Sequence, residues 1–152
     1  MASVHVERLD HLGLLASTIR DLGLISMIDA RLVPDEQEEI TPGEAVAGMI
    51  LNGLGFANRP LSLTPQFFAN KPLDLLLRGG VHAEMFNRFK LGRTLDDAYS
   101  DGGELLLRAL ALGVCAQEGS DRRFNHLATT SCSLSGAYVP DSDAQAMTST
   151  HG

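Results

Sequence analysis

The residues best suited to chemistry by type lie at positions 124–134, where a histidine, a threonine and a cysteine are separated by even numbers of residues. This stretch is rich in Thr and small residues, as strands often are, and alternation places His126, Thr130 and Cys132 on one face with Ala128. A cysteine nucleophile paired with a histidine base is the chemistry that these types suggest. However, six residues of strand separate Cys132 from His126 by about 20 Å, so the two side chains cannot share a hydrogen bond. The spacing therefore argues against nucleophilic catalysis.

Metal-ligating residues also lack a suitable spacing. The two cysteines, Cys115 and Cys132, lie in a helical and a strand-like context, and no CxxC pair or Cys/His cluster occurs. Asp141 and Asp143 fall among turn residues. We therefore expect no structural zinc and no cofactor in this chain, and the cysteine usage fits a reducing cytoplasm.

A basic grouping offers a second kind of site, a contact with DNA. Arg88, Lys90 and Arg93 lie between a short apolar helix and a second helix that the sequence predicts to begin at Thr94. Helix, turn and helix is a form in which many proteins enter the major groove. The alternative is a solvated connector that carries ordinary surface charge. The net charge of -7 argues against a protein dominated by non-specific attraction to nucleic acid, although it leaves room for a local basic patch.

Helical patterns fill the part of the chain that would position these residues. Apolar residues recur at helical spacing over residues 9–33, with a break expected near Gly23. Thr41, Pro42 and Glu44 form a capping box, which starts a helix that Gly55 should end. Thr64 is expected to cap a further helix, and a well-patterned helix runs over residues 104–117. The acidic run at residues 35–44 is expected to be a solvated loop and helix start.

The pattern changes at about residue 120, which divides the expected organisation in two. We predict a mainly α fold, with a small helical domain over residues 1–119 and a β-hairpin over residues 120–152. A two-stranded hairpin is marginal alone, so the second region is expected to be the incomplete start of a larger domain. Residues 1–10 show no signal-peptide pattern, and no apolar run reaches the length of a membrane span.

Residues 9–116 resemble the helical region, of unassigned function, that precedes the catalytic core in a family of DDE-type insertion-sequence transposases. The order and length of a series of segments carry this resemblance more than any single motif. The segments are Leu9-Asp10-His11-Leu12-Gly13, Ile40-Thr41-Pro42-Gly43-Glu44-Ala45 and Leu91-Gly92-Arg93-Thr94-Leu95-Asp96-Asp97. Residues 123–152 resemble the opening hairpin of the RNase H-like catalytic domain in the same family.

The resemblance also identifies one departure from the family. The first strand of such a catalytic domain carries a His-Leu-Asp-Thr-Thr-Ser pattern, in which the Asp is the first of three metal-binding carboxylates. This chain has His126 and Leu127 followed by Ala128, whose methyl group can neither bind Mg²⁺ nor carry charge. The resemblance implies Mg²⁺ for the full-length family and none for this chain, which is expected to lack the other two carboxylates as well.

Three functions are consistent with the sequence. The first is a truncated, inactive insertion-sequence transposase fragment, which is not an enzyme. The second is a DNA-binding fragment that recognises transposon ends or pairs with full-length transposase, with Arg88, Lys90 and Arg93 as the contact residues. The third is an unrelated helical module for protein interactions. The cysteine usage leads us to expect a cytoplasmic chain, and the lack of a long apolar run leads us to expect no membrane partner.

Overall fold

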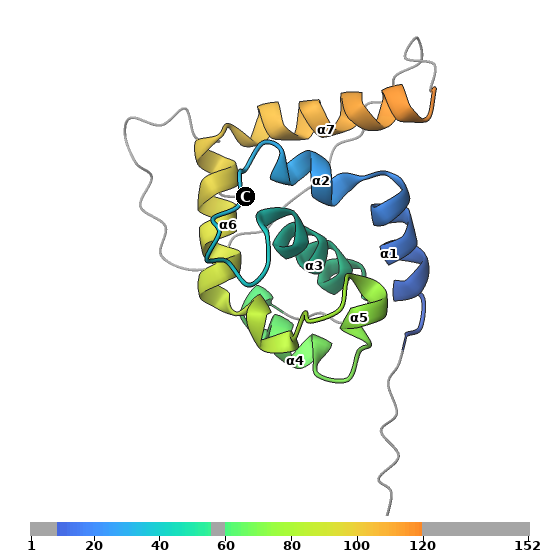
Figure 1. The fold of residues 1–152 in the computed structure, drawn as a ribbon, viewed down its shortest axis with the longest axis vertical. Coiled ribbons are helices and arrows are strands. Elements are labelled where there is room, and N and C mark those ends of the chain that lie inside the picture. Colours follow the sequence, from blue (N-terminus) through green and yellow to red (C-terminus); the bar gives the residue numbers. More distant parts are fainter. Residues whose placement is uncertain (1–8, 56–59, 120–152) are drawn as a thin grey trace, which may run out of the picture. The chain divides into compact units, whose positions relative to one another are not determined.

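The computed structural model describes residues 9–55 and 60–119, and these ranges belong to one compact unit. The unit is helical, and the described residues contain no strand (Figure 1). In chain order the elements are α1 (Leu12–Asp21), α2 (Leu24–Asp29), α3 (Pro42–Leu54), η1 (Leu61–Leu63), α4 (Thr64–Phe68), α5 (Leu73–Leu76), η2 (Ala83–Phe86), α6 (Arg88–Ser100) and α7 (Gly103–Gln117). The predicted hairpin and Ala128 lie outside the described residues.

Local sequence signals explain where several helices begin and end. The capping box at α3 is confirmed: the Glu44 amide donates to the Thr41 hydroxyl at 3.1 Å, and the Thr41 amide donates to the Glu44 carboxylate at 2.9 Å. Gly55 ends this helix, as expected. The predicted break near Gly23 is also confirmed, since Gly23 adopts φ +63° between α1 and α2.

The core is built around α3, which lies at the centre of the unit with α1, α2, α4, α5 and α6 around it (Figure 1). Small residues of α3 allow a neighbouring side chain to approach its backbone closely. A Cβ added at Gly48 would lie 2.3 Å from the ring of Phe86, which is itself completely buried. The main cluster joins α3 to side chains from α1, α4, α5 and η2. Its largest fully buried apolar members are Leu12, Ile40, Leu51, Phe68, Leu76, Phe86 and Leu91.

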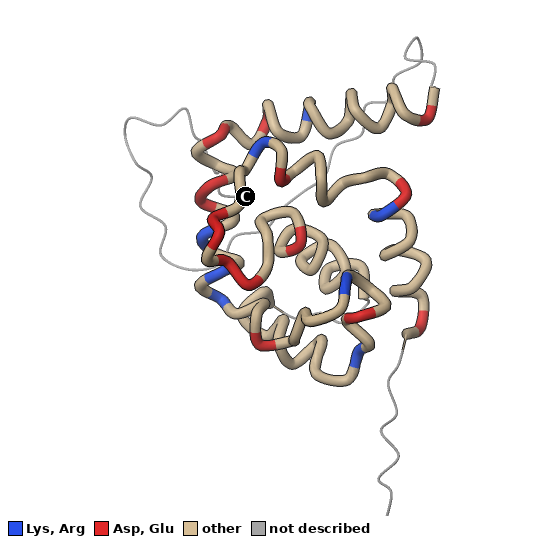
Figure 2. Tube along the Cα trace, viewed as in Figure 1, with Lys and Arg blue, Asp and Glu red and all other residues tan. Residues whose placement is uncertain are grey.

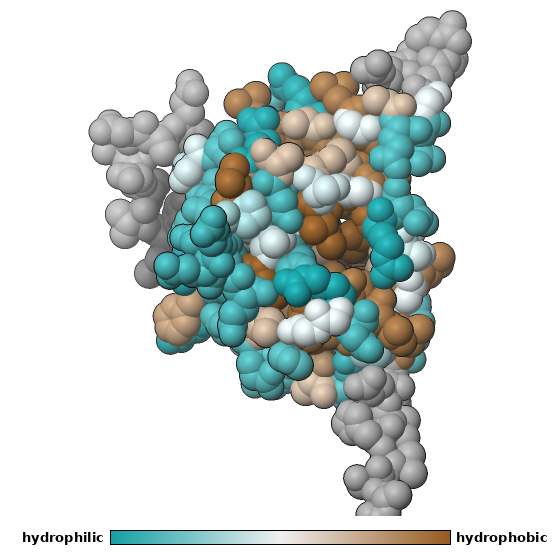
Figure 3. All heavy atoms as spheres, viewed as in Figure 1, coloured by the Kyte–Doolittle hydropathy of each residue, from teal (hydrophilic) through white to brown (hydrophobic). Residues whose placement is uncertain are grey.

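The last helix, α7, packs through one edge only. Leu106 is its one buried residue, and it joins Ile28 and Leu32 in a second, smaller cluster. Leu105, Leu107 and Leu112 are exposed, and apolar surface is visible along α7 in Figure 3. The predicted helix over residues 104–117 is thus confirmed. The described elements α2 and α6 cover only part of its apolar surface.

The predicted helix start at Thr94 is wrong, and the predicted helix at Thr64 is present but is not capped by Thr64. Thr94 does not begin a helix, because α6 starts at Arg88, where the Asn87 side chain accepts hydrogen bonds from the Phe89 and Lys90 amides. Thr94 instead lies within α6 and is buried, so its packing outweighs its resemblance to a cap. Thr64 is the first residue of α4 rather than its cap, and its hydroxyl donates to the Leu61 carbonyl at 2.7 Å.

Candidate interaction surface

The three basic residues predicted to contact DNA all lie on the first two turns of α6. Arg88 and Arg93 are exposed, whereas Lys90 is turned toward the body of the domain. The ammonium group of Lys90 lies 2.6 Å from the carboxylate of Glu38, and only 11% of the lysine side chain is exposed. The structure therefore separates the predicted cluster into two available arginines and one lysine that is already paired.

The pairing of Lys90 corrects the expectation that the acidic run at residues 35–44 is solvated. Glu38 is largely covered, and Glu44 is buried with 5% of its surface exposed. Glu44 accepts from the guanidinium of Arg78 as well as from the Thr41 amide. The hydrogen bond that Arg78 donates to Glu44 raises the pKa of the Arg78 guanidinium above its usual value. Two members of the run thus support the fold.

Most of the other basic side chains in the described part of the chain are also paired. Ion pairs join Arg31 to Asp101, Lys71 to Asp10, Arg78 to Glu44 and Arg108 to Glu104. Arg20 donates to the Leu75 carbonyl at 3.1 Å. Within the described ranges, Arg88 and Arg93 are the cations that have no acidic or carbonyl partner. The Arg88 guanidinium lies 4.7 Å from the centre of the Phe89 ring, a cation–π contact on the surface.

Four exposed residues form a line along the outward side of α6. Phe89, Arg93, Asp96 and Ser100 follow one another at spacings of four, three and four residues, which places them on one helix face. All four are exposed, and we name them the outer stripe. Figure 2 shows the two signs of charge separated along α6, with basic residues on its first half and acidic residues beyond.

The order of charges on α6 opposes the helix dipole. Its first turn holds Arg88 and no acidic residue, and its last turn holds no basic residue. Carboxylates are favourable near a helix N-terminus and cations near its C-terminus, so this order destabilises the isolated helix by a few tenths of a kcal/mol per charge.

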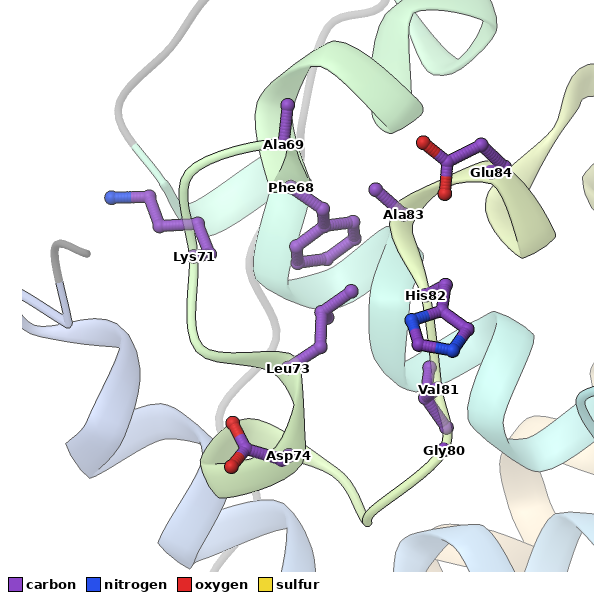
Figure 4. Close-up of a pocket in the computed structure, with 10 residues that line it drawn as sticks. All are labelled: Phe68, Ala69, Lys71, Leu73, Asp74, Gly80, Val81, His82, Ala83 and Glu84. Atoms are coloured by element: carbon purple, nitrogen blue, oxygen red, sulfur yellow. The ribbon is translucent and has the colours of Figure 1, made fainter. Parts of the chain in front are cut away.

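A pocket of about 470 Å³ lies elsewhere, between α4, α5 and η2 (Figure 4). Its floor is apolar, and Asp74, His82 and Glu84 stand at its exposed rim. The ammonium group of Lys71 extends away from the pocket toward Asp10, 3.0 Å distant. The lining residues are Phe68, Ala69, Lys71, Leu73, Asp74, Gly80, Val81, His82, Ala83 and Glu84. No hydrogen bond joins the rim side chains to one another, so the pocket holds no assembled acid–base pair.

The part of the chain that the structure describes contains no group of three His, Cys, Asp or Glu residues placed to hold a metal ion. Nor does any helix in those ranges have the length and apolar character to cross a membrane. His126, Ala128, Cys132, Asp141 and Asp143 lie outside the described residues, so the expectations about them stay predictions.

Sequence reasoning missed the acidic half of the α6 surface and the partner of Lys90. The outer-stripe spacing was present in the sequence, but a helix start assigned at Thr94 divided it between two elements. Glu38 precedes Lys90 by 52 positions, and no local pattern connects them. The stripe could have been found by extending the helix back to Asn87, whereas the Glu38 contact could not.

Comparison with known proteins gives one match. A family model described as "Domain of unknown function (DUF4277)" matches residues 4–112, which is more than half of the chain. No curated protein matches, and no solved structure matches.

Proposed function

The chain belongs to this family of unassigned function, and we propose that it is a catalytically inactive relative of insertion-sequence transposases that acts by contact rather than by chemistry. The observation that carries the proposal is Ala128, which follows His126 and Leu127 where the resembling transposases place a metal-binding Asp. Two-metal phosphoryl transfer needs carboxylates that hold both ions beside the attacking and leaving oxygens. An alanine removes one of these ligands, and with it the charge that attracts Mg²⁺.

A nicking assay tests this proposal directly. The full chain is incubated with supercoiled plasmid in Mg²⁺ or Mn²⁺, and parallel samples contain a chelator. We expect the plasmid to stay supercoiled at every protein concentration. Nicking or linearisation that the chelator abolishes, and that follows the protein through purification, would show a working metal site and overturn the proposal.

Weak binding to duplex DNA is a second candidate function, favoured by the exposed positions of Arg88 and Arg93. Because Lys90 is paired with Glu38, two phosphate contacts are expected, which corresponds to a log–log salt slope of about -2. Changing Arg88 and Arg93 to Ala should flatten that slope. Arg108→Ala is the matched control, since Arg108 is exposed but paired with Glu104 on α7. Equal slopes for the parent and the double variant would remove DNA as a partner of α6.

The charge around the two arginines favours a protein partner over DNA. Asp96 lies on the same face as Arg93 one turn away, and a phosphate backbone along α6 would meet its carboxylate. The chain as a whole carries a net charge of -7, which adds a longer-range repulsion. Pairing with another protein, such as a full-length transposase that shares this domain, would instead use both signs of charge.

A further inference from the structure

The outer stripe of α6 has a spacing that reads the same from both ends. Phe89, Arg93, Asp96 and Ser100 are separated by four, three and four residues, so reversing the helix leaves the pattern of positions unchanged. When two such helices lie antiparallel about a two-fold axis, the first position faces the fourth and the second faces the third. The stripe therefore has the geometry that an isologous contact requires.

The chemistry of the stripe matches the same symmetry. We propose that the outer stripe of α6 pairs two copies of this chain, antiparallel, with Arg93 of each copy facing Asp96 of the other. Among the described residues of one chain, neither Arg93 nor Asp96 takes part in an ion pair within 4.0 Å, although the two are three residues apart on one face. Both side chains are exposed. A second copy would place its Asp96 opposite Arg93 and its Arg93 opposite Asp96, which gives two pairs of opposite charge.

Aromatic side chains border the same surface and supply its apolar part. Phe89 is 66% exposed and Tyr99 is 80% exposed, so both rings are available to a partner. In the antiparallel arrangement, Arg88 and Phe89 of one copy approach the end of α6 where Tyr99 and Ser100 of the other copy lie. The Arg88 guanidinium, which already rests on the Phe89 ring, would then also meet the face of a tyrosine. Tyr, Phe and Arg are residue types enriched at protein interfaces.

A second copy also accounts for the unfavourable order of charges along α6. In an antiparallel pair the basic first half of each helix lies against the acidic second half of the other, and the two helix dipoles oppose one another. The charges that destabilise α6 alone are thus neutralised by the partner. Duplex DNA would neutralise only the arginines and would place Asp96 against a phosphate. A second copy of the chain and duplex DNA are therefore alternative partners for the same surface.

One face of a 13-residue helix is a small contact, so the association should be weak and should depend on concentration. Sedimentation velocity on the full chain measures it, with Arg93→Asp and Asp96→Arg as variants. Each variant places like charges in both pairs of its own dimer, and each should raise the dimer dissociation constant about tenfold or more.

Mixing the two variants provides the decisive observation. In a mixed pair, every Asp at position 93 faces an Arg at position 96 of the other chain, and every remaining Asp96 faces an Arg93. Two variants that are monomeric alone should therefore associate with each other as strongly as the parent does. No effect within a single chain can produce this recovery. Glu36→Arg is the control for net charge, because Glu36 is exposed in a loop outside α6, and it should leave association unchanged or slightly stronger.

Circular dichroism of each variant establishes that the helices are retained. If a charge reversal unfolds the chain, Arg93→Gln and Asp96→Asn replace it, and each should weaken association without the loss of helix. A parent that stays monomeric at the highest soluble concentration overturns the proposal, and so does a mixture that fails to associate. If the parent instead binds duplex DNA through Arg88 and Arg93 while remaining monomeric, the surface belongs to DNA and the pairing proposal is wrong.

Discussion

The helices α3 and α6 have the same length but differ in how deeply the rest of the domain buries them. Each contains 13 residues and begins with a polar side chain that caps the first backbone amides. Eight residues of α3 are buried, including its acidic Glu44, whereas α6 buries only Leu91 and Thr94. Similar caps therefore begin both a helix that is mostly buried and a helix that is mostly exposed. The two helices differ in how many of their residues are buried in the domain.

The largest expected difference between the two helices comes from matched leucine truncations. Leu51 of α3 is completely buried, and Leu95 of α6 is 47% exposed. Leu51→Ala should lower the free energy of unfolding by about 2–5 kcal/mol, because it removes buried methyl groups and leaves a cavity. Leu95→Ala should lower it by less than about 1 kcal/mol. Urea denaturation followed by circular dichroism measures both, and comparable losses would refute the contrast.

Glycine substitutions should change stability in opposite directions in the two helices. An alanine Cβ at Gly48 would lie 2.3 Å from the Phe86 ring, which is enclosed by the core, so Gly48→Ala should cost about 1–3 kcal/mol. At Gly92 of α6 a Cβ would meet no atom within 4 Å. Gly92→Ala should instead stabilise the protein by up to about 1 kcal/mol, because alanine favours helix. Thermal melts of the two variants would disagree with the account if their midpoints moved in the same direction.

The smallest expected effect concerns the charge order of α6. Asp97 lies near the C-terminal end of the helix, outside the outer stripe, where the dipole favours a cation. Asp97→Lys should raise the free energy of unfolding by about 0.3–1 kcal/mol at low salt, and Asp97→Asn should give a smaller gain in the same direction. The gain should shrink as salt is added. A loss of stability in both variants would indicate that Asp97 supports the fold.

The sequence predicted those parts of the fold that depend on neighbouring residues. The capping box at Thr41, the break at Gly23 and the end of α3 at Gly55 follow from local backbone chemistry. The start of α6 was misplaced because Thr94 has the neighbours of a cap, and only the burial of its side chain shows that the helix continues through it. The boundary of a helix is thus less predictable where a tertiary contact competes with a local signal.

The candidate surface was predicted in part. The sequence predicted Arg88, Lys90 and Arg93 as a basic group on the connection between two helices, and the structure places all three within one helix, α6. It could not show that Lys90 pairs with Glu38, because that contact depends on how a distant loop packs. The expectation that Ala128 replaces a catalytic carboxylate concerns residues outside the described ranges and stays a prediction.

Hydrogen exchange measured at several protein concentrations tests most directly whether α3 packs within the domain while α6 contacts a second copy of the chain. Weak pairing through the outer stripe should slow exchange in the peptides that cover α6 as concentration rises, and should leave those of α3 unchanged. The Arg93→Asp variant should lose the concentration dependence and keep the slow exchange of α3. Exchange in α6 that is independent of concentration in the parent, or a slowing spread evenly over both helices, would contradict the account.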